Sequence, residues 1–148
     1  MPDIETAHPE QRPRDLAQRH LTYRVVAMPA DTNGAGDIFG GWLMAQVDLA
    51  GSILAFQAAA GRIATVAVNE FRFLRPVLVG DVVTCYSRLR YIGKTSVQIG
   101  VEVEAERMGE SDASRLVAEA TLTYVALTPE GRPRRIPRTG QERGASSG

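Results

Sequence analysis

Asp48 has the clearest potential for chemistry, because it interrupts an apolar segment that has the pattern of a helix. Aspartate is unfavourable inside helices, since its side chain competes for backbone hydrogen-bond donors. The residues expected beside it on the helix surface are all small, namely Ala45, Ser52 and Ala55. A small-walled groove that contains one carboxylate is what a substrate channel would need. The alternative is that Asp48 faces solvent or forms an ion pair at an interface.

Two glycines, Gly40 and Gly41, stand at the predicted start of the same helix, just after Asp37. The first N–H groups of a helix have no partner within it and carry the positive end of its dipole. Beside glycines they are unobstructed, so they could bind the carbonyl oxygen of an ester or thioester and stabilise the oxyanion formed on attack. The alternative is close packing, with Asp37 as a charge complement worth under about 1 kcal/mol. Asp48 follows about two turns later, which favours the catalytic interpretation.

Three further segments could contact an anionic ligand: residues 75–81 between two predicted strands, the predicted hairpin tip 93–96, and an arginine-rich stretch near the C-terminus. Residues 93–96 are similar to the end of a phosphate-binding loop, but the required upstream glycine and downstream helix are missing, so a P-loop is excluded. The candidate contacts are Arg75, Lys94, Thr95, Ser96, Arg132, Arg134, Arg135 and Arg138. The alternative for all of them is an ordinary solvated surface.

Composition excludes several classes of function. The chain has 148 residues, and 17 basic side chains balance 17 acidic ones, which argues against a nucleic-acid partner. The only histidines, His8 and His20, lie near the N-terminus, so neither a usual zinc site nor a histidine-assisted nucleophile is expected in the body of the domain. We therefore expect catalysis without a metal ion or a cofactor, resting on carboxylates, amides, hydroxyls or backbone groups.

The single cysteine, Cys85, cannot form an internal disulfide, so nothing favours an oxidising compartment. The longest apolar-rich segment, residues 42–60, contains four polar side chains and is not a plausible transmembrane helix. We expect a cytoplasmic protein with no membrane partner.

One helix and five strands are expected to position these groups. The helix runs from about Gly40 to just before Gly61, and its two apolar faces contain Leu43, Val47, Ala50, Leu54 and Ala58 on one side and Leu49, Ile53 and Phe56 on the other. Strands are predicted over residues 21–28, 64–73, 81–92, 95–107 and 115–127, with a tight turn at 93–94. Four consecutive strands after one helix indicate the α+β class with an antiparallel sheet.

A helix that is apolar on two sides must be enclosed. We therefore expect the hotdog fold, in which an antiparallel sheet wraps around one long central helix, and a dimer that completes the burial. The domain is predicted to cover residues 19–138, after a disordered N-terminal arm (1–18) and before a flexible tail (139–148).

Three segments carry a resemblance to a known family: Met-Pro-Ala-Asp-Thr-Asn at 28–33, Gly-Asp-Ile-Phe-Gly-Gly-Trp at 36–42, and Phe-Leu-Arg-Pro-Val-Leu-Val-Gly-Asp-Val-Val at 73–83. Over about residues 27–137 the chain resembles the bacterial acyl-CoA thioesterases of the hotdog superfamily, in particular the broad-specificity YciA-like group. The resemblance implies hydrolysis of acyl-CoA to coenzyme A and a carboxylic acid, without metal, in fatty acid metabolism. It also implies dimers with shared active sites, commonly assembled as a trimer of dimers, a homohexamer.

The resemblance also implies roles for individual residues. Asp48 would be the catalytic carboxylate, and Asp37 of the facing subunit would assist it. The thioester carbonyl would point at the N–H groups of Gly40 and Gly41, while Asp48 activates a water or attacks directly. The residues expected to contact coenzyme A are Asn69, Arg75, Lys94, Thr95, Ser96 and Arg135.

The same fold can also serve two other functions. A hotdog dehydratase would be expected to use a histidine, and His8 and His20 lie too far from the helix start. A non-catalytic acyl-CoA sensor or assembly module would use the same pocket for binding alone. Asp48 favours the enzyme, because an uncompensated carboxylate facing a neutral thioester has no evident purpose in binding.

Overall fold

The computed structural model describes residues 18–110 and 114–137. The expected arm (1–18) and tail (139–148) lie outside the described residues, apart from Gln18. In chain order the elements are β1 (His20–Val26), the 3-10 helix η2 (Pro29–Asp31), α2 (Gly40–Ala59), β2 (Ile63–Phe73), β3 (Asp81–Ile92), β4 (Ser96–Arg107) and β5 (Arg115–Ala126). The predicted helix and strands are confirmed, whereas η2 was not anticipated.

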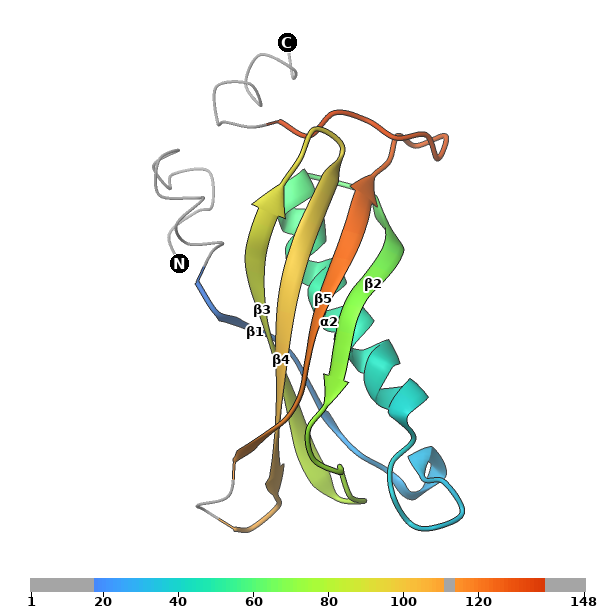
Figure 1. The fold of residues 1–148 in the computed structure, drawn as a ribbon, viewed down its shortest axis with the longest axis vertical. Coiled ribbons are helices and arrows are strands. Elements are labelled where there is room, and N and C mark those ends of the chain that lie inside the picture. Colours follow the sequence, from blue (N-terminus) through green and yellow to red (C-terminus); the bar gives the residue numbers. More distant parts are fainter. Residues whose placement is uncertain (1–17, 111–113, 138–148) are drawn as a thin grey trace.

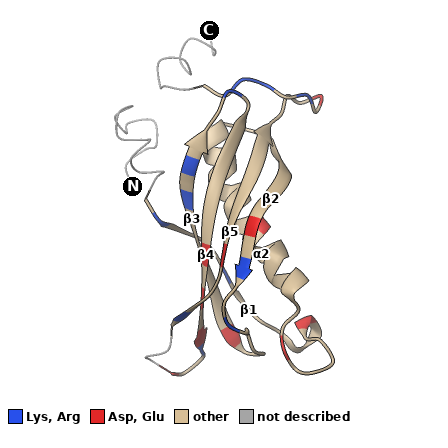
Figure 2. Cartoon of the chain, in the orientation of Figure 1, with Lys and Arg blue, Asp and Glu red and all other residues tan. Residues whose placement is uncertain are grey.

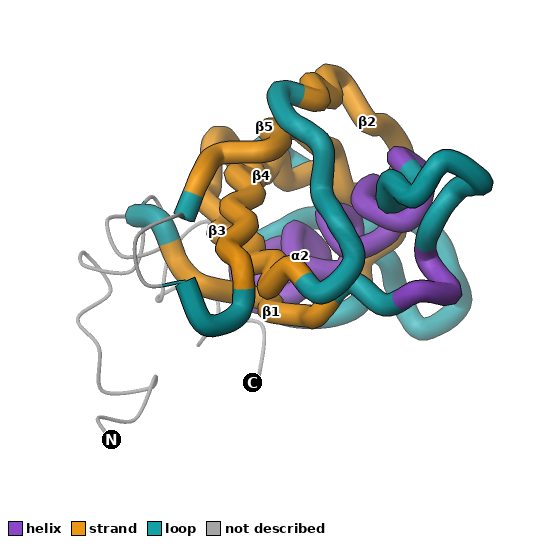
Figure 3. Tube along the Cα trace, turned by 90° about the horizontal axis from the view of Figure 1, so that it is seen from below, coloured by secondary structure: helices purple, strands orange, loops and turns teal. Residues whose placement is uncertain are grey.

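The five strands form one antiparallel sheet in the order β1-β3-β4-β5-β2, so β1 and β2 are its edges. α2 lies along one face of this sheet (Figure 1), and an end-on view shows the strands curving around one side of the helix (Figure 3). The predicted α+β architecture, a sheet wrapped around one central helix, is confirmed.

α2 packs one apolar face on the sheet and leaves the other uncovered. The sheet-facing residues Val47 and Leu54 are at most 1% exposed. On the opposite side, Leu49, Ile53 and Phe56 are 50%, 48% and 56% exposed. The single chain therefore covers the helix on one side only, as expected if a second protein surface completes the burial.

The C-terminal end of α2 has a Schellman motif, in which Ala60 N–H donates to the Gln57 carbonyl (3.3 Å) and Gly61 N–H donates to the Phe56 carbonyl (3.1 Å). Ala60 itself takes the left-handed conformation, with φ +57°. The left-handed conformation, which favours glycine, is therefore at position 60, whereas the glycine expected to end the helix is at position 61. Gly61 instead gives room to Arg134, whose Nη2 would lie 3.0 Å from a Cβ at position 61.

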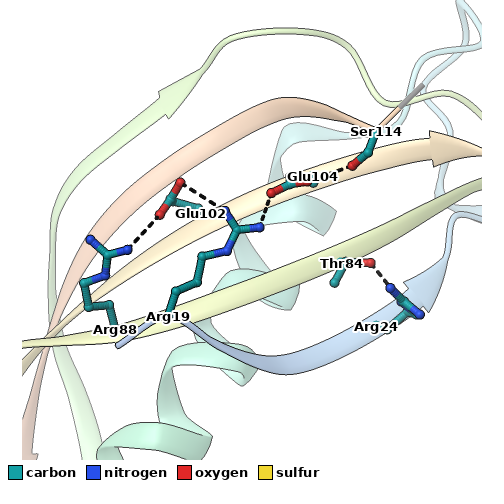
Figure 4. A network of polar contacts seen from close by, with 7 residues as sticks. All are labelled: Arg19, Arg24, Thr84, Arg88, Glu102, Glu104 and Ser114. Atoms are coloured by element: carbon teal, nitrogen blue, oxygen red, sulfur yellow. Dashed lines mark hydrogen bonds and ion pairs between the residues drawn. The ribbon is translucent and has the colours of Figure 1, made fainter. Parts of the chain in front are cut away.

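Charged residues occur along the strands of the sheet (Figure 2), and one network of charged side chains crosses β3 and β4 on the face away from α2 (Figure 4). Arg19 pairs with Glu102 (3.7 Å) and with Glu104, and Arg88 lies 3.8 Å from Glu102. The hydrogen bond from Ser114 (2.7 Å), together with Arg19, lowers the pKa of Glu104. Because these pairs are partly solvated, each contributes little to stability.

Candidate active site

Asp48 lies in the third turn of α2 and is half-buried. Its Oδ1 accepts a hydrogen bond from Thr65 Oγ1 on β2 (2.7 Å) and lies 3.2 Å from the hydroxyl of Tyr124 on β5. Tyr124 also reaches the main-chain oxygen of Asp48, at 3.0 Å. Thr65 and Tyr124 are cross-strand partners, so the register of β2 and β5 brings both hydroxyls beneath one turn of the helix.

The two carboxylate oxygens of Asp48 have different surroundings. Thr65 Oγ1 donates to Oδ1, and the single proton of the Tyr124 hydroxyl is shared between Oδ1 and the main-chain oxygen of Asp48, whereas Oδ2 has no hydrogen-bond partner within residues 18–110 and 114–137. Burial, and secondly the charge of Asp48, raise the pKa of the Tyr124 phenol far above its usual range, so Tyr124 remains a donor at neutral pH. A carboxylate anchored through one oxygen presents the lone pairs of the other to a water or a substrate.

The start of α2 offers free amide groups. Phe39 is the N-cap, and no side chain caps the first turn. In the part of the chain that the structure describes, the N–H groups of Gly40 and Gly41 have no acceptor. A Cβ at Gly40 would lie 3.2 Å from the ring of Phe73, whereas one at Gly41 would meet nothing within 4 Å. Gly40 therefore permits packing on Phe73, and Gly41 leaves its side of the helix start open.

Backbone contacts fix the residues before α2 against the β2–β3 connection. Ile38 N–H donates to the Val77 carbonyl (3.1 Å), and Asp37 forms an isolated bridge with Leu78. The side-chain oxygen of Asn33 accepts from Asp37 N–H at 3.2 Å. The side chain of Asp37 is exposed. The helix start is thus held by its backbone, and the Asp37 carboxylate is left at the surface.

A cavity of about 310 Å³ opens beside the helix start. Its walls come from the first turn of α2 and from residues 73–77, and they include Leu43, Phe73 and Val77. Arg75 also lines it, while its Nη1 donates to the Leu116 carbonyl (3.0 Å). The cavity is therefore mainly apolar, with one guanidinium at its wall.

The other predicted coenzyme A contacts divide between two places. Lys94, Thr95 and Ser96 lie at the β3–β4 hairpin, at the end of the molecule where α2 finishes (Figure 1). Ile136 N–H donates to the Lys94 carbonyl (2.8 Å), which brings the preceding residue, Arg135, to the same end. The structure thus gathers these four residues, but at the end opposite Arg75 and the helix start.

Asn69 does not lie on the Asp48 side of the sheet. Its Oδ1 accepts from Thr123 Oγ1 (2.6 Å). Thr123 precedes Tyr124 on β5, and successive side chains of a strand point to opposite faces. Asn69 is therefore turned to the outer face, whereas Tyr124 points to Asp48.

Thr65, Tyr124 and Gly51 were not predicted as site residues from the sequence. Threonine and tyrosine are common strand residues, so only the pairing of β2 with β5 reveals that they meet Asp48. Gly51 carried a signal, since glycine inside a helix is unfavourable and marks a packing or functional need. A Cβ at Gly51 would lie 2.4 Å from the Tyr124 hydroxyl.

No group of three or more metal-ligating side chains occurs among the residues that the structure describes. The same residues contain no helix long and apolar enough to cross a membrane.

A sheet of five antiparallel strands around one long helix, with a carboxylate between them, defines a hotdog-fold protein. The hexameric hotdog fold thioesterase of Campylobacter jejuni has this fold; it is 36% identical, covers 86% of this chain and 96% of its own, and superposes with a TM-score of 0.74. The thioesterase superfamily matches residues 35–111. Acyl-CoA thioester hydrolase YciA of Escherichia coli (strain K12) is 50% identical over 125 residues, 83% of this chain and 95% of that protein. The chain therefore belongs to the thioesterase superfamily, in its YciA-like group.

A more distant relative bears on the site itself. The acyl-CoA hydrolase of Staphylococcus aureus, solved in complex with butyryl coenzyme A, is 30% identical, covers 78% of this chain and 70% of its own, and has a TM-score of 0.72. Structures of its alanine variants replace an aspartate, a threonine 17 positions later and an asparagine 15 positions earlier. In this chain Thr65 and Asn33 have the same spacings from Asp48.

Proposed function

We propose that this chain hydrolyses acyl-CoA thioesters to coenzyme A and a carboxylic acid, with Asp48 as the catalytic carboxylate. The observation that carries the proposal is the anchoring of Oδ1 by the Thr65 and Tyr124 hydroxyls, while Oδ2 has no hydrogen-bond partner in the part of the chain that the structure describes. The kinship with acyl-CoA thioester hydrolases supports the reaction. A hydrolase solved with butyryl coenzyme A has been studied as variants of an asparagine, an aspartate and a threonine. Their spacing equals that of Asn33, Asp48 and Thr65, which supports the site.

Asp48 can begin the reaction in two ways. As a general base, Oδ2 takes a proton from a water whose oxygen bonds to the thioester carbon, and such a base contributes about 10²–10⁴-fold. As a nucleophile, Oδ2 bonds to that carbon itself, and water later hydrolyses the mixed anhydride. In both routes the carbon–sulfur bond breaks, and coenzyme A leaves as a thiolate that takes up a proton.

The free N–H groups of Gly40 and Gly41 are suited to the developing oxyanion. Removing one donor of this kind typically lowers kcat by about 10²–10³-fold. The adjoining apolar cavity would hold the acyl chain of the same substrate. The groups that stabilise the oxyanion and the cavity that binds the acyl chain would therefore both lie at the start of α2.

The proposal includes an active site shared between two protomers. Within one chain Gly41 and Asp48 lie two helical turns apart, about 10 Å along the axis, whereas reacting atoms must approach to about 3–3.5 Å. The uncovered side of α2 carries Leu49, Ile53 and Phe56, and a second copy that covers it would bring its own helix start into reach. Hexameric relatives support a trimer of such dimers.

The predicted coenzyme A contacts lie at opposite ends of one protomer, and a two-fold axis perpendicular to the strands would bring them together. It sets the β3–β4 hairpin end of one protomer beside the helix start of its partner. Lys94, Thr95, Ser96 and Arg135 would then meet the phosphates of a coenzyme whose thioester lies near the partner's N–H groups. Arg75 belongs to the cavity side of the same site.

Asp37 would assist from the facing subunit, since its carboxylate is exposed beside the helix start. The contact of Asn69 with coenzyme A stays a prediction, and it could form only on the outer face of the sheet. A cytoplasmic location is also part of the proposal, because the one cysteine, Cys85, is free and buried.

A free-thiol assay on a panel of acyl-CoA chain lengths tests the activity. Hydrolysis with release of one thiol per acyl group is the expected result. Tight binding of every acyl-CoA without thiol release would instead identify the acyl-CoA sensor. The exposed carboxylate variant Glu130→Gln is the matched control and should retain full activity.

A further inference from the structure

Tyr124 is buried completely, yet it is polar at its tip. Its hydroxyl lies beneath α2 and has two acceptors on a single residue, the main-chain oxygen of Asp48 at 3.0 Å and Oδ1 at 3.2 Å. Phenylalanine would fill nearly the same volume without burying a hydroxyl that must find a partner. The hydroxyl therefore calls for an explanation beyond packing.

Gly51 leaves the space that the Tyr124 hydroxyl occupies. It lies in the interior of α2 and is buried against Tyr124 and Val101. A Cβ there would come within 2.4 Å of the Tyr124 hydroxyl oxygen, but only within 3.3 Å of the ring carbon that carries it. Without the hydroxyl the closest atoms would be that ring carbon at 3.3 Å and a Val101 methyl at 3.4 Å, so an alanine would fit after a shift of a few tenths of an ångström. Glycine is less favourable than alanine inside a helix. Gly51 therefore lowers the stability of the helix but leaves space for the Tyr124 hydroxyl oxygen.

We propose that Tyr124 and Gly51 form a positioning device for Asp48. The Tyr124 hydroxyl draws Oδ1 toward the sheet together with Thr65, and Gly51 provides the space in which that hydroxyl must sit. The rotamer of Asp48 is thereby fixed, and Oδ2 points to the substrate. This inference rests on the proposed catalytic role of Asp48. Burial raises the pKa of the Tyr124 phenol further above neutral pH, so the hydroxyl remains a donor throughout the neutral range.

Four proteins test the device: the wild type, Tyr124→Phe, Gly51→Ala and the double variant. Tyr124→Phe should lower kcat about tenfold, as expected for losing a hydrogen bond to a charged group, with KM within about twofold. Gly51→Ala should cause a similar loss, because it displaces the same hydroxyl. The double variant should match Tyr124→Phe alone, near tenfold, rather than show the hundredfold loss of two independent defects.

Two readouts separate positioning from general structural damage. In Tyr124→Phe the loss should fall on kcat alone, because the lost hydrogen bond positions the carboxylate and does not bind the substrate, so KM stays within about twofold. The control Tyr91→Phe, at a residue that is 64% exposed, should change neither kcat nor KM. If Gly51→Ala does not fold, the kcat and KM of Tyr124→Phe decide the question alone.

A folded Tyr124→Phe with wild-type kcat would overturn the inference, and so would multiplicative losses in the double variant. Asp48→Asn, assayed in parallel, keeps this failure distinct from failure of the proposed function. If Asp48→Asn is inactive while Tyr124→Phe is fully active, the carboxylate is catalytic but is not positioned by Tyr124. If Asp48→Asn is active, the proposed role of Asp48 itself is wrong.

Discussion

Mixing two inactive variants of this chain would reveal whether each active site draws on two protomers. Asp48→Asn removes the carboxylate, and Gly41→Pro removes an amide proton in the first helical turn, where proline is tolerated. Position 41 is open, since an added Cβ meets nothing within 4 Å. Each variant alone should lose about 100-fold or more in kcat.

The expected recovery follows from the symmetry of a shared site. Such a site is intact when its Asp48 comes from a Gly41→Pro chain and its helix start comes from an Asp48→Asn chain. In randomly mixed dimers each condition holds about half the time, so about a quarter of the sites are intact. If both groups came from one protomer, no site would be intact. The distance of about 10 Å between Gly41 and Asp48 on one helix favours the first result.

The assay needs assemblies that contain both variants. Co-expression with two different affinity tags and sequential purification would supply them, and thiol release from acyl-CoA would measure their activity. Wild type mixed with Asp48→Asn serves as the control and should retain about half of the wild-type activity. Verified mixed assemblies that are no more active than the separate variants would refute the shared site.

Thr65→Val should lower kcat about tenfold because Oδ1 of Asp48 loses a donor, whereas Thr65→Ser should retain most of the activity in steady-state kinetics; equal losses would contradict a role for the hydroxyl. Ala60→Gly should raise the free energy of unfolding by about 1 kcal/mol, since glycine adopts the left-handed conformation without strain, and an unchanged urea midpoint would contradict this. The double variant Lys94→Ala, Arg135→Ala should raise KM for acyl-CoA about tenfold with kcat nearly unchanged. A thioester of a short thiol without phosphates should show no such change, and an equal rise for both substrates would exclude the proposed phosphate contacts.

The helix and strands could be predicted because their patterns are local. The apolar spacing of α2 and the alternation of β4 each follow from side chains within one element. The end of α2 was predicted less well, since two neighbouring residues compete for the left-handed position and Ala60, rather than Gly61, occupies it.

The surroundings of Asp48 could not be predicted, because they depend on long-range register. Thr65 and Tyr124 are 59 positions apart in the sequence and become neighbours only when β2 pairs with β5. Two irregularities in that pairing, at residues 65–67 and 68–70, also change which side chains face α2. Simple alternation from Thr65 would put Asn69 on the same face, but an extra residue reverses the alternation, and Asn69 contacts Thr123 instead.

Thiol release by Asp48→Asn under single-turnover conditions, with acyl-CoA binding measured separately, tests the carboxylate most directly. Asparagine preserves the shape of the side chain and removes the charge that accepts a proton or attacks carbon. We predict binding within about threefold of the wild type and thiol release slower by about 100-fold or more. A folded Asp48→Asn with the assembly state of the wild type and a near-normal rate of thiol release would contradict the account.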